Sequence, residues 1–386
     1  MVRYTSSGAE PLVPDGGAIP GSVAGIRRLL WVLQHPTPYN IYLLNELDKR
    51  LEIPSEAVFR YRQLPNHPWN ALPSLNCRWR FALPEGRSDR DLNDLAAHDA
   101  STVIVFGGWR DRTIFGALWR RYTAGLPYAF WTDTPKPAGG MARWMLDRTF
   151  VRFAKRAVVT FATGAPAVQR YHEMGLPHDS VVNFPFVVDP ASFAVAGARR
   201  PARVLRLLQV GRLIDSIKGQ MVAFEALRRA IALSGCGSIR LAIAGVGPDD
   251  AALRAAADRM GIAAAVEFLG WVGYEAMARL FAESDALLMP SLWDPFPVTV
   301  IEALTAGLPV LGSDACGSVI ERVRPDENGY IHRAGDSAAL SEHILRLLDR
   351  SIRDRLASAA AAGACEWGVE KCVEAIRSGL ARITYR

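Results

Sequence analysis

The sequence predicts an α/β protein of two domains, each built on a doubly wound parallel β-sheet. Three observations support this prediction. The chain of 386 residues is too long for one ordinary domain and short for three. Short apolar runs alternate with helical segments, which is typical of βαβ units. The alternation stops at residues 188–203, where proline, glycine and small residues gather, and then begins again.

This break divides the chain into five expected segments. They are a loose polar tail at 1–25, a first α/β domain at 26–190, a linker at 191–203, a second α/β domain at 204–365 and a C-terminal helix at 366–386. The tail lacks the apolar stretch of a signal peptide. No apolar run approaches the ~18 residues that a membrane-spanning helix needs. We therefore expect a cytoplasmic protein.

The elements of the first domain follow from short apolar runs that end in loops. We expect strands at 28–33, 102–106, 128–131 and 157–161, and helices at 41–51 and 138–156. Residues 54–86 are rich in proline, tryptophan and arginine and show no clear period, so we expect loops around one or two short strands there.

The second domain repeats the alternation more regularly. We expect strands at 204–210, 240–244, 266–269, 286–289 and 309–311, and helices at 219–233, 249–260, 274–284 and 298–306. A last helix is expected at 366–383. Ligands of doubly wound sheets lie beyond the carboxyl ends of the strands, so the functional residues should lie in the loops that follow them.

Charge and cysteine content narrow the class of partner. Residues 1–200 carry 24 Lys and Arg against 17 Asp and Glu, whereas residues 201–386 carry 21 against 22. This basic first half fits an anionic membrane surface, a phosphorylated acceptor or nucleic acid, or simply solvated arginines. Of these partners, we do not expect nucleic acid. Five cysteines without C-x-x-C spacing argue against a disulfide scaffold and a zinc site.

The expected helix at 138–156 is the most basic part of the first half. It combines aromatic residues with the cations Arg143, Arg148, Arg152, Lys155 and Arg156. The favoured interpretation is a core-packed helix with a solvated basic face. The alternative is peripheral contact with the inner face of a membrane, because basic amphipathic helices bind anionic lipids.

Five motifs of the second domain form the strongest constellation in the sequence. They are Gly211–Gly219 (GRLIDSIKG), Ala244–Pro248 (AGVGP), Phe268–Val272 (FLGWV), Pro290–Glu302 (PSLWDPFPVTVIE) and Ala306–Val310 (AGLPV). In order and spacing they resemble the C-terminal domain of family 4 glycosyltransferases, which are retaining enzymes with the two-domain GT-B fold. The resemblance covers residues 204–350 and, over 26–190, rests on the order of strands and helices. It implies a Rossmann-like acceptor-binding domain followed by a Rossmann-like nucleotide-sugar-binding domain.

The first motif provides two cations after a strand that ends in Gly211. Fixed cations at Arg212 and Lys218 suit a diphosphate, and the resemblance implies that both contact the donor diphosphate. It also implies that the backbone near Trp271 borders the nucleotide base. Gly245-Val-Gly247 is followed by Asp250 where the dinucleotide fingerprint needs glycine or alanine, so we expect no NAD and no other cofactor.

The longest motif contains two carboxylates eight positions apart, Asp294 and Glu302. A turn at Phe296-Pro297 opens a helix at about Val298, whose amides can receive an anion. The resemblance implies that the first carboxylate contacts the hydroxyls of the donor sugar and that the second accepts both ribose hydroxyls. Asp294 is one methylene shorter than the glutamate usual in the family, and Pro297 replaces its usual glycine, which leaves the sugar open.

The first domain gives fewer candidates. Asp133 ends an apolar strand near the place where the family often carries a His-Asp pair, although Thr132 here replaces the histidine. We name Asp133 with Asp294 as catalytic residues and His35 as a possible contact to donor or acceptor. The D-x-D sequence at Asp89–Asp91 follows a polar loop instead of an apolar strand, so we interpret it as chance and expect no metal site.

The resemblance implies transfer of a sugar from a UDP- or GDP-sugar to a hydroxyl of a glycan, lipid-linked or small-molecule acceptor. Cell-envelope or exopolysaccharide assembly is the expected pathway, with a metal-independent mechanism. Two alternatives stay open: a GT-B nucleotide-sugar epimerase, and a non-catalytic subunit that binds a nucleotide sugar.

Overall fold

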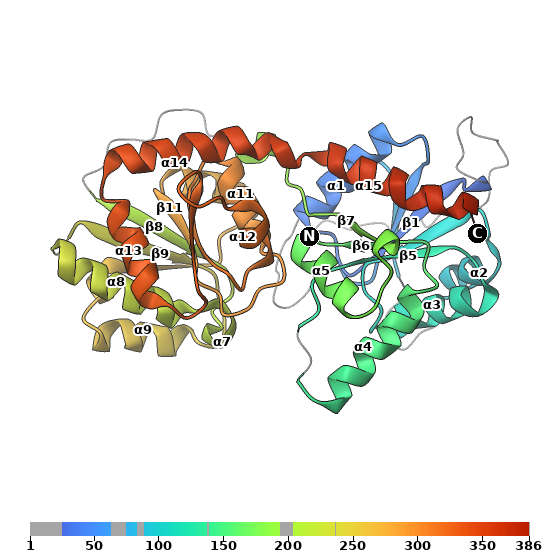
Figure 1. The fold of residues 1–386 in the computed structure, drawn as a ribbon, viewed down its shortest axis with the longest axis horizontal. Helices are drawn as coiled ribbons and strands as arrows, with labels where there is room; N and C mark the ends of the chain where they lie inside the picture. The colour runs from blue at the N-terminus through green and yellow to red at the C-terminus, as the bar shows by residue number, and fades with distance from the viewer. Residues whose placement is uncertain are drawn as a thin grey trace, which may run out of the picture.

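The structure, a computed structural model, describes residues 25–62, 75–82, 89–136, 139–193, 204–235 and 237–385. Residues 1–24 of the expected tail and residues 194–203 of the expected linker lie outside the described residues. Two α/β domains lie side by side, and a C-terminal helical segment crosses from one to the other (Figure 1). The predicted fold class is confirmed, since each domain has its own parallel sheet.

The first domain contains a seven-stranded parallel sheet in the order β3-β2-β1-β4-β5-β6-β7. Its strands are β1 (Arg28–Leu33), β2 (Ser55–Phe59), β3 (Arg78–Phe81), β4 (Thr102–Phe106), β5 (Tyr128–Thr132), β6 (Thr160–Ala162) and β7 (Val181–Asn183). The strand expected at 157–161 begins later, because the Ala157 amide still bonds to the carbonyl of Phe153 and completes the preceding helix. Successive residues of β1 enter opposite cores: Leu29 and Trp31 face one, Leu30 and Val32 the other.

The second domain contains a six-stranded parallel sheet in the order β10-β9-β8-β11-β12-β13. Its strands are β8 (Leu205–Val210), β9 (Ile239–Ala244), β10 (Val266–Gly270), β11 (Ala286–Met289), β12 (Val310–Ser313) and β13 (Gly329–His332). The edge strand β13 was not expected from the sequence. It is four residues long and begins with glycine, so it lacks the apolar run that marks the others.

Helices cover both faces of the sheets. In the first domain they are α1 (Pro38–Arg50), α2 (Arg90–His98), α3 (Arg112–Ala124), α4 (Met141–Ala154), α5 (Ala165–Glu173) and α6 (Pro190–Phe193). In the second they are α7 (Asp215–Lys218), α8 (Gln220–Ser234), α9 (Asp250–Arg259), α10 (Tyr274–Ala282), α11 (Val298–Thr305), α12 (Gly317–Arg322), α13 (Ser337–Arg346) and α14 (Arg350–Gly363). Both sheets are thus enclosed, as parallel sheets require.

The last helix, α15 (Val369–Ala381), returns to the first domain (Figure 1). Its buried residues Val369, Cys372 and Ile376 join the core that contains Trp31. Where the chain leaves α14, the guanidinium of Arg322 lies 3.8 Å from the ring centre of Trp367. The C-terminal segment therefore connects the two domains a second time.

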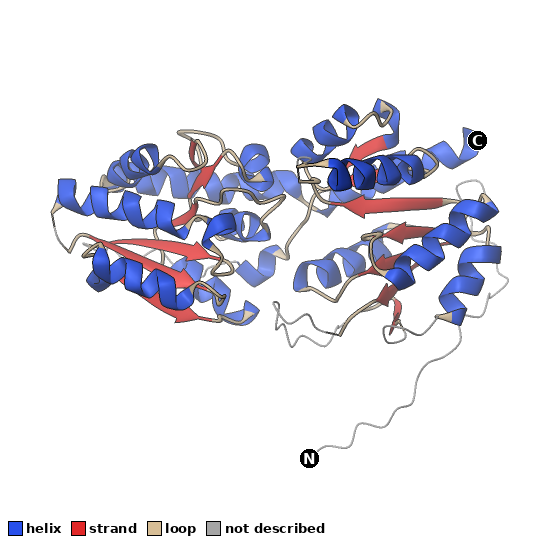
Figure 2. Cartoon of the chain, turned by 90° about the horizontal axis from the view of Figure 1, so that it is seen from below, coloured by secondary structure: helices blue, strands red, loops and turns tan. Residues whose placement is uncertain are grey.

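The carboxyl ends of the two sheets point toward each other across the interface between the domains (Figure 2). The loops that follow the strands of both sheets consequently meet at this interface, where doubly wound sheets bind ligands. Among the residues that the structure describes, no helix combines the length and the apolarity needed to cross a bilayer.

Candidate functional site

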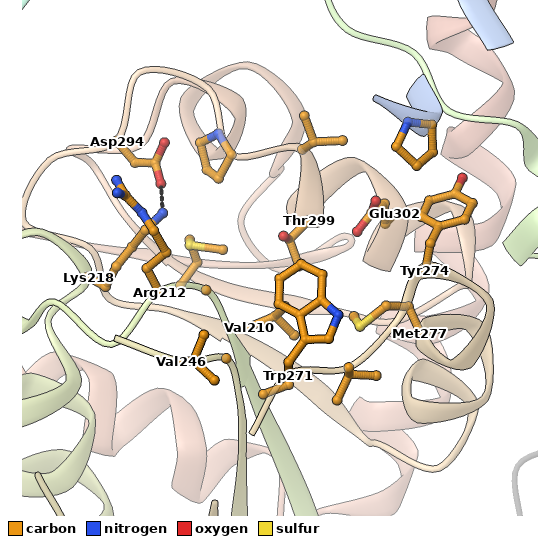
Figure 3. A pocket seen from close by; sticks show the side chains of 18 of the residues that line it. Val210, Arg212, Lys218, Val246, Trp271, Tyr274, Met277, Asp294, Thr299 and Glu302 are labelled. Carbon is orange, nitrogen blue, oxygen red and sulfur yellow. Dashed lines mark hydrogen bonds and ion pairs between the residues drawn. The ribbon is translucent and has the colours of Figure 1, made fainter. Parts of the chain in front are cut away.

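A cavity of about 280 Å³ opens at the carboxyl ends of β8, β9, β10 and β11 (Figure 3). Most of its lining comes from the second domain, and Pro38 and Tyr39 of α1 close it from the first domain. The cavity brings together most of the site residues expected from the sequence: Gly211, Arg212, Lys218, Trp271, Asp294, Pro297, Val298 and Glu302.

One end of the cavity is charged. Lys218, at the end of α7, forms an ion pair and hydrogen bond with Asp294, which lies in the loop after β11. Both side chains are largely shielded from water, with 18% and 10% of their surface exposed. Arg212 lies beside this pair (Figure 3). An anion that enters here meets two cations, of which Lys218 is paired with Asp294.

Two buried glutamines fix the backbone of the loop that carries these cations. Gln209 donates a hydrogen bond to the carbonyl of Lys218 at 3.0 Å, and Gln220 donates one to the carbonyl of Arg212 at 3.0 Å. They are 3% and 1% exposed. Neither glutamine was expected from the sequence, although polar side chains on either side of a motif are a signal that could have identified them.

A close backbone approach shapes the floor of the cavity. Gly245 has φ +148°, and a Cβ atom there would lie 1.8 Å from the carbonyl oxygen of Gly211. Only glycine allows this conformation and this contact without strain. The amide of Gly245 bonds to the carbonyl of Gly270 at 2.7 Å, so the loops after β8, β9 and β10 form one connected surface.

The other end of the cavity combines apolar side chains with the carboxylate of Glu302 (Figure 3). Glu302 lies on α11, and burial raises its pKa to about 7. The Tyr274 hydroxyl faces it: burial raises the pKa of this phenol, and the negative charge of Glu302 raises it further. Trp271, 39% exposed, and Met277 provide flat and apolar surface beside them. This end can accept hydrogen bonds from hydroxyl groups and cover an aromatic ring.

Between the two ends lies the N-terminus of α11. Val298 and Thr299 line the cavity, and Pro297 occupies the capping position without a side-chain hydrogen bond to the helix amides. Asp294 does not cap α11, because its carboxylate binds Lys218. The amides at the start of this helix add positive potential next to the two cations.

The side chain of Phe296, expected among the donor contacts, lies instead between the domains. It is 4% exposed and its ring centre lies 6.0 Å from that of Phe186. A Cβ atom at Gly164 would lie 2.4 Å from the ring, so Phe296 packs directly on the backbone of the first domain. The turn before α11 is thereby held against the opposite domain.

Asp133 lies at the end of β5 and lines a neighbouring cavity of about 270 Å³ with Arg110 and Arg143. It is accessible from the open cleft. Protein atoms nevertheless crowd its carboxyl group, and this desolvation is the main cause of a pKa raised to about 6. A hydrogen bond with Thr163 lowers the pKa, and the charge of Asp294 raises it. The two expected catalytic carboxylates therefore face the same cleft from opposite domains.

The remaining expected residues lie away from the first cavity. His35 is half-buried in the loop after β1 and lines neither cavity. Asp89 caps α2 by accepting a hydrogen bond from the amide of Leu92 at 3.0 Å, and it pairs with Arg80 at 2.8 Å. Within the described residues, no group of three or more His, Cys, Asp or Glu is arranged to hold a metal ion.

Sequence comparisons identify relatives of the second domain. Residues 205–350 match the family of group 1 glycosyl transferases. The amylovoran biosynthesis glycosyltransferase AmsK of Erwinia amylovora is 31% identical over 180 residues, which cover 45% of this chain and 43% of that protein. The D-inositol 3-phosphate glycosyltransferase of Streptomyces scabiei is 31% identical over 252 residues, 61% of this chain and 55% of that protein. The chain spans about half the length of the curated relatives it matches.

Solved structures extend the similarity to both domains. The complex of Anabaena Alr3699/HepE with UDP and glucose has a TM-score of 0.73 at 17% identity, covering 91% of this chain and 98% of that chain. The apo form of the lipopolysaccharide outer core galactosyltransferase WaaB has a TM-score of 0.67 at 16% identity, covering 91% and 99%. At these identities the likeness shows the fold. The resemblance indicated by the motifs is thus confirmed over residues 205–350, which are similar to the group 1 glycosyl transferases, and the two domains together have the GT-B fold.

Proposed function

We propose that this protein transfers a sugar from a nucleoside diphosphate sugar to an acceptor hydroxyl, with retention at the anomeric carbon. The observation that carries the proposal is the composition of the first cavity. Two cations and a helix N-terminus gather at one end, and a half-buried carboxylate with aromatic and apolar side chains lies at the other. This arrangement matches the diphosphate, ribose and base of such a donor in order.

The donor would bind along this axis. Arg212, Lys218 and the amides of α11 would neutralise the diphosphate. Glu302 would accept hydrogen bonds from the two ribose hydroxyls, for which its carboxylate must be ionised. Trp271 and Met277 would cover the base, which we propose to be uracil or guanine.

The donor sugar would then lie in the cleft between Asp294 and Asp133. The bond from its anomeric carbon to the diphosphate breaks, and the acceptor oxygen bonds to the same face of that carbon. The acceptor proton passes to a phosphate oxygen of the leaving group. Asp294 would stabilise the positive charge that develops on the sugar, and Lys218 and Arg212 the negative charge on the diphosphate. Asp133 would orient the acceptor hydroxyl by accepting its hydrogen bond.

Polysaccharide assembly is the pathway that we propose. The relatives of the second domain include glycosyltransferases of amylovoran biosynthesis and, by name, of colanic acid biosynthesis. A glycan or lipid-linked acceptor follows from this proposal, and a small-molecule acceptor remains the second choice.

The decisive experiment is a panel of nucleotide sugars with nucleotide release measured in the presence and absence of a mixture of glycan and lipid-linked acceptors. Release that depends on the acceptor, with a product whose anomeric configuration by NMR equals that of the donor, supports retaining transfer. Release without acceptor would favour the epimerase alternative. Tight nucleotide-sugar binding without any turnover would favour a non-catalytic subunit, and an inverted product would contradict retention.

A further inference from the structure

Helix α4 projects from the body of the first domain (Figure 1). Its first two turns expose large apolar side chains to water: Met141 is 70% exposed, Trp144 is 48% exposed and Met145 is 59% exposed. The core-facing side of the helix carries Phe150 and Phe153, which are buried. The expected core-packed helix is therefore present, and a second apolar surface lies on its outer side.

Positive charge is concentrated in the stretch of sequence that contains this helix. Residues 112–156 contain nine Lys and Arg against two Asp, a net charge of +7, whereas the whole chain has +6. The one acidic residue of α4, Asp147, pairs with Arg143 at 3.1 Å. Arg148, Arg152 and Lys155 are exposed on the outer side of the helix or directly after it.

The apolar side chains and the cations occupy different parts of α4, and this order bears on how the helix could meet a bilayer. The apolar side chains occupy the projecting end, and the cations follow toward the domain. Trp144 and Arg152 are about 12 Å apart along the axis, at 1.5 Å per residue. An amphipathic helix bound to a bilayer lies in the interface, with its apolar groups about 5–10 Å deep at the headgroup and acyl-chain boundary and its cations on the polar side. If α4 is tilted with its N-terminal end toward the bilayer, Trp144 and Met145 can reach this depth while Arg152 stays at the polar surface.

We infer that α4 docks the first domain on an anionic phospholipid surface. Soluble phosphates would neutralise the cations but leave Trp144 and Met145 in water. A second copy of this chain would cover the apolar end but bring two segments of charge +7 together. An anionic bilayer satisfies both requirements. The inference does not depend on the proposed sugar transfer.

Docking by α4 has a geometric consequence for the cleft. The inner side of the same helix lines the cavity of Asp133 through Arg143, Leu146 and Phe150. A docked α4 therefore holds this cavity close to the bilayer surface, where a lipid-linked molecule can reach it.

The test is co-sedimentation of the full chain with two kinds of vesicle, one of phosphatidylcholine alone and one of about three parts phosphatidylcholine to one part phosphatidylglycerol. We expect binding to the anionic vesicles at ~0.1 M salt, little binding to the neutral ones, and strong weakening at ~0.5 M salt. Tryptophan fluorescence should shift to the blue on binding, because Trp144 leaves water.

Two variants separate charge from apolar insertion. Arg148→Glu/Arg152→Glu should lower vesicle binding at least tenfold, since each cation near the surface contributes about fivefold. Trp144→Ala/Met145→Ser should lower it to a similar degree and abolish the blue shift. The matched controls are Arg228→Glu/Arg229→Glu and Leu233→Ser on α8, where Leu233 is 74% exposed. All these side chains lie on the surface, so the variants should fold normally.

Three results would overturn the inference. The first is a wild-type chain that does not bind the anionic vesicles. The second is a loss of binding in the α8 controls equal to that of the α4 variants, which would indicate attraction by net charge alone. The third is a wild-type dimer in sedimentation velocity that the α4 variants dissolve, without vesicle binding; it would identify a second copy as the occupant.

Discussion

The two walls of the cleft are built in different ways. The wall from the second domain consists of loops that hold one another through backbone contacts, such as that of Gly245 with Gly211. The wall from the first domain contributes separate side chains at the ends of elements, among them Tyr39 on α1 and Asp133 after β5. Rigid loops suit the diphosphate and ribose of the proposed donor, which have a fixed shape, whereas separate side chains can change with the proposed acceptor without disturbing the fold.

The two aspartates show the same difference in electrostatic terms. Asp294 has a cationic partner within its own domain, because Lys218 binds it directly. The pKa of Asp133, in contrast, rises to about 6, mainly because protein atoms crowd its carboxyl group. The first carboxylate is thus paired with a cation, whereas the pKa of the second is raised toward neutral pH.

The largest expected effect comes from exchanging these two carboxylates for amides. Asp294→Asn should lower kcat about 100-fold or more while KM changes little, because it removes a charge that stabilises the transition state. Asp133→Asn should lower kcat less, about tenfold, because the amide oxygen that replaces the carboxylate still accepts the hydrogen bond of the acceptor hydroxyl, although without a charge. Steady-state kinetics with the donor identified in the panel measure both.

The matched control for these variants is Asp250→Asn, an exposed carboxylate of α9 that pairs with Arg254. It should retain full activity. Asp294→Glu restores the length usual in the family and should reduce activity or change the preferred donor. A wild-type kcat in Asp294→Asn would show that Asp294 takes no part in the chemistry. A larger loss of kcat in Asp133→Asn than in Asp294→Asn would show that the carboxylate of the first domain contributes more to catalysis than that of the second.

The next effect concerns the cations of the second domain. Arg212→Ala and Lys218→Ala should each weaken donor affinity at least tenfold, since charge-assisted hydrogen bonds contribute about 1.5–3 kcal/mol. Lys218→Ala should also reduce kcat, because Asp294 is left without its partner. Calorimetry with UDP and GDP gives the affinities, with Arg279→Ala, 84% exposed on α10, as the control. Affinities equal to wild type in both variants would exclude this site for the diphosphate.

A smaller, pH-dependent effect should come from Glu302. Its pKa of about 7 means that half of the carboxyl groups are protonated near neutral pH. Only the ionised form accepts both ribose hydroxyls, so nucleotide affinity should fall about tenfold as pH falls from about 8 to 6. Glu302→Gln should bind nucleotide more weakly at pH 8 and lose this pH dependence. An unchanged profile in the variant would assign the titration to the phosphate of the ligand.

Glu302 should also affect the thermal stability of the fold. Its pKa in the folded chain lies above the ordinary value, so the folded state holds the proton more tightly than the unfolded state. Stability therefore falls as pH rises from about 4.5 to about 7, where the unfolded state is ionised and the folded state still holds the proton, and the full penalty remains above pH 7. Glu302→Gln should raise the Tm at pH 8 and leave it unchanged at pH 4. A lower Tm at pH 8 would contradict the desolvated position of this carboxyl group.

The sequence predicted the second domain well because its strands are apolar runs that end in glycine, as at Gly211 and Gly245. It failed at β13, since four residues that begin with glycine carry too little periodic signal. Arg212 and Glu302 could be predicted to lie in one cavity, because the family resemblance assigns both to the donor and because ligands bind at the carboxyl ends of parallel strands.

Other parts of the site could not be predicted for physical reasons. Phe296 lies in a turn, and the direction of its ring is decided by Gly164 of the other domain. Tyr39 closes the cavity from the other domain, far away in sequence, so no local pattern identifies it. The side of α4 that remains exposed also depends on tertiary packing, because both of its sides carry large apolar residues.

The smallest expected effect is that of a chelator. If Arg212, Lys218 and the start of α11 neutralise the diphosphate, then EDTA should leave turnover unchanged, because the protein supplies the charge that Mg²⁺ supplies elsewhere. A more stringent version of this experiment uses the Lys218→Ala variant, in which part of the positive charge is missing. Added Mg²⁺ should restore some activity to this variant and none to the wild type, since the ion can then reach an exposed phosphate. Complete loss of wild-type activity in EDTA, restored by Mg²⁺ or Mn²⁺, would show that the diphosphate needs a metal ion. Arg212 and Lys218 would then only supplement the charge of that ion.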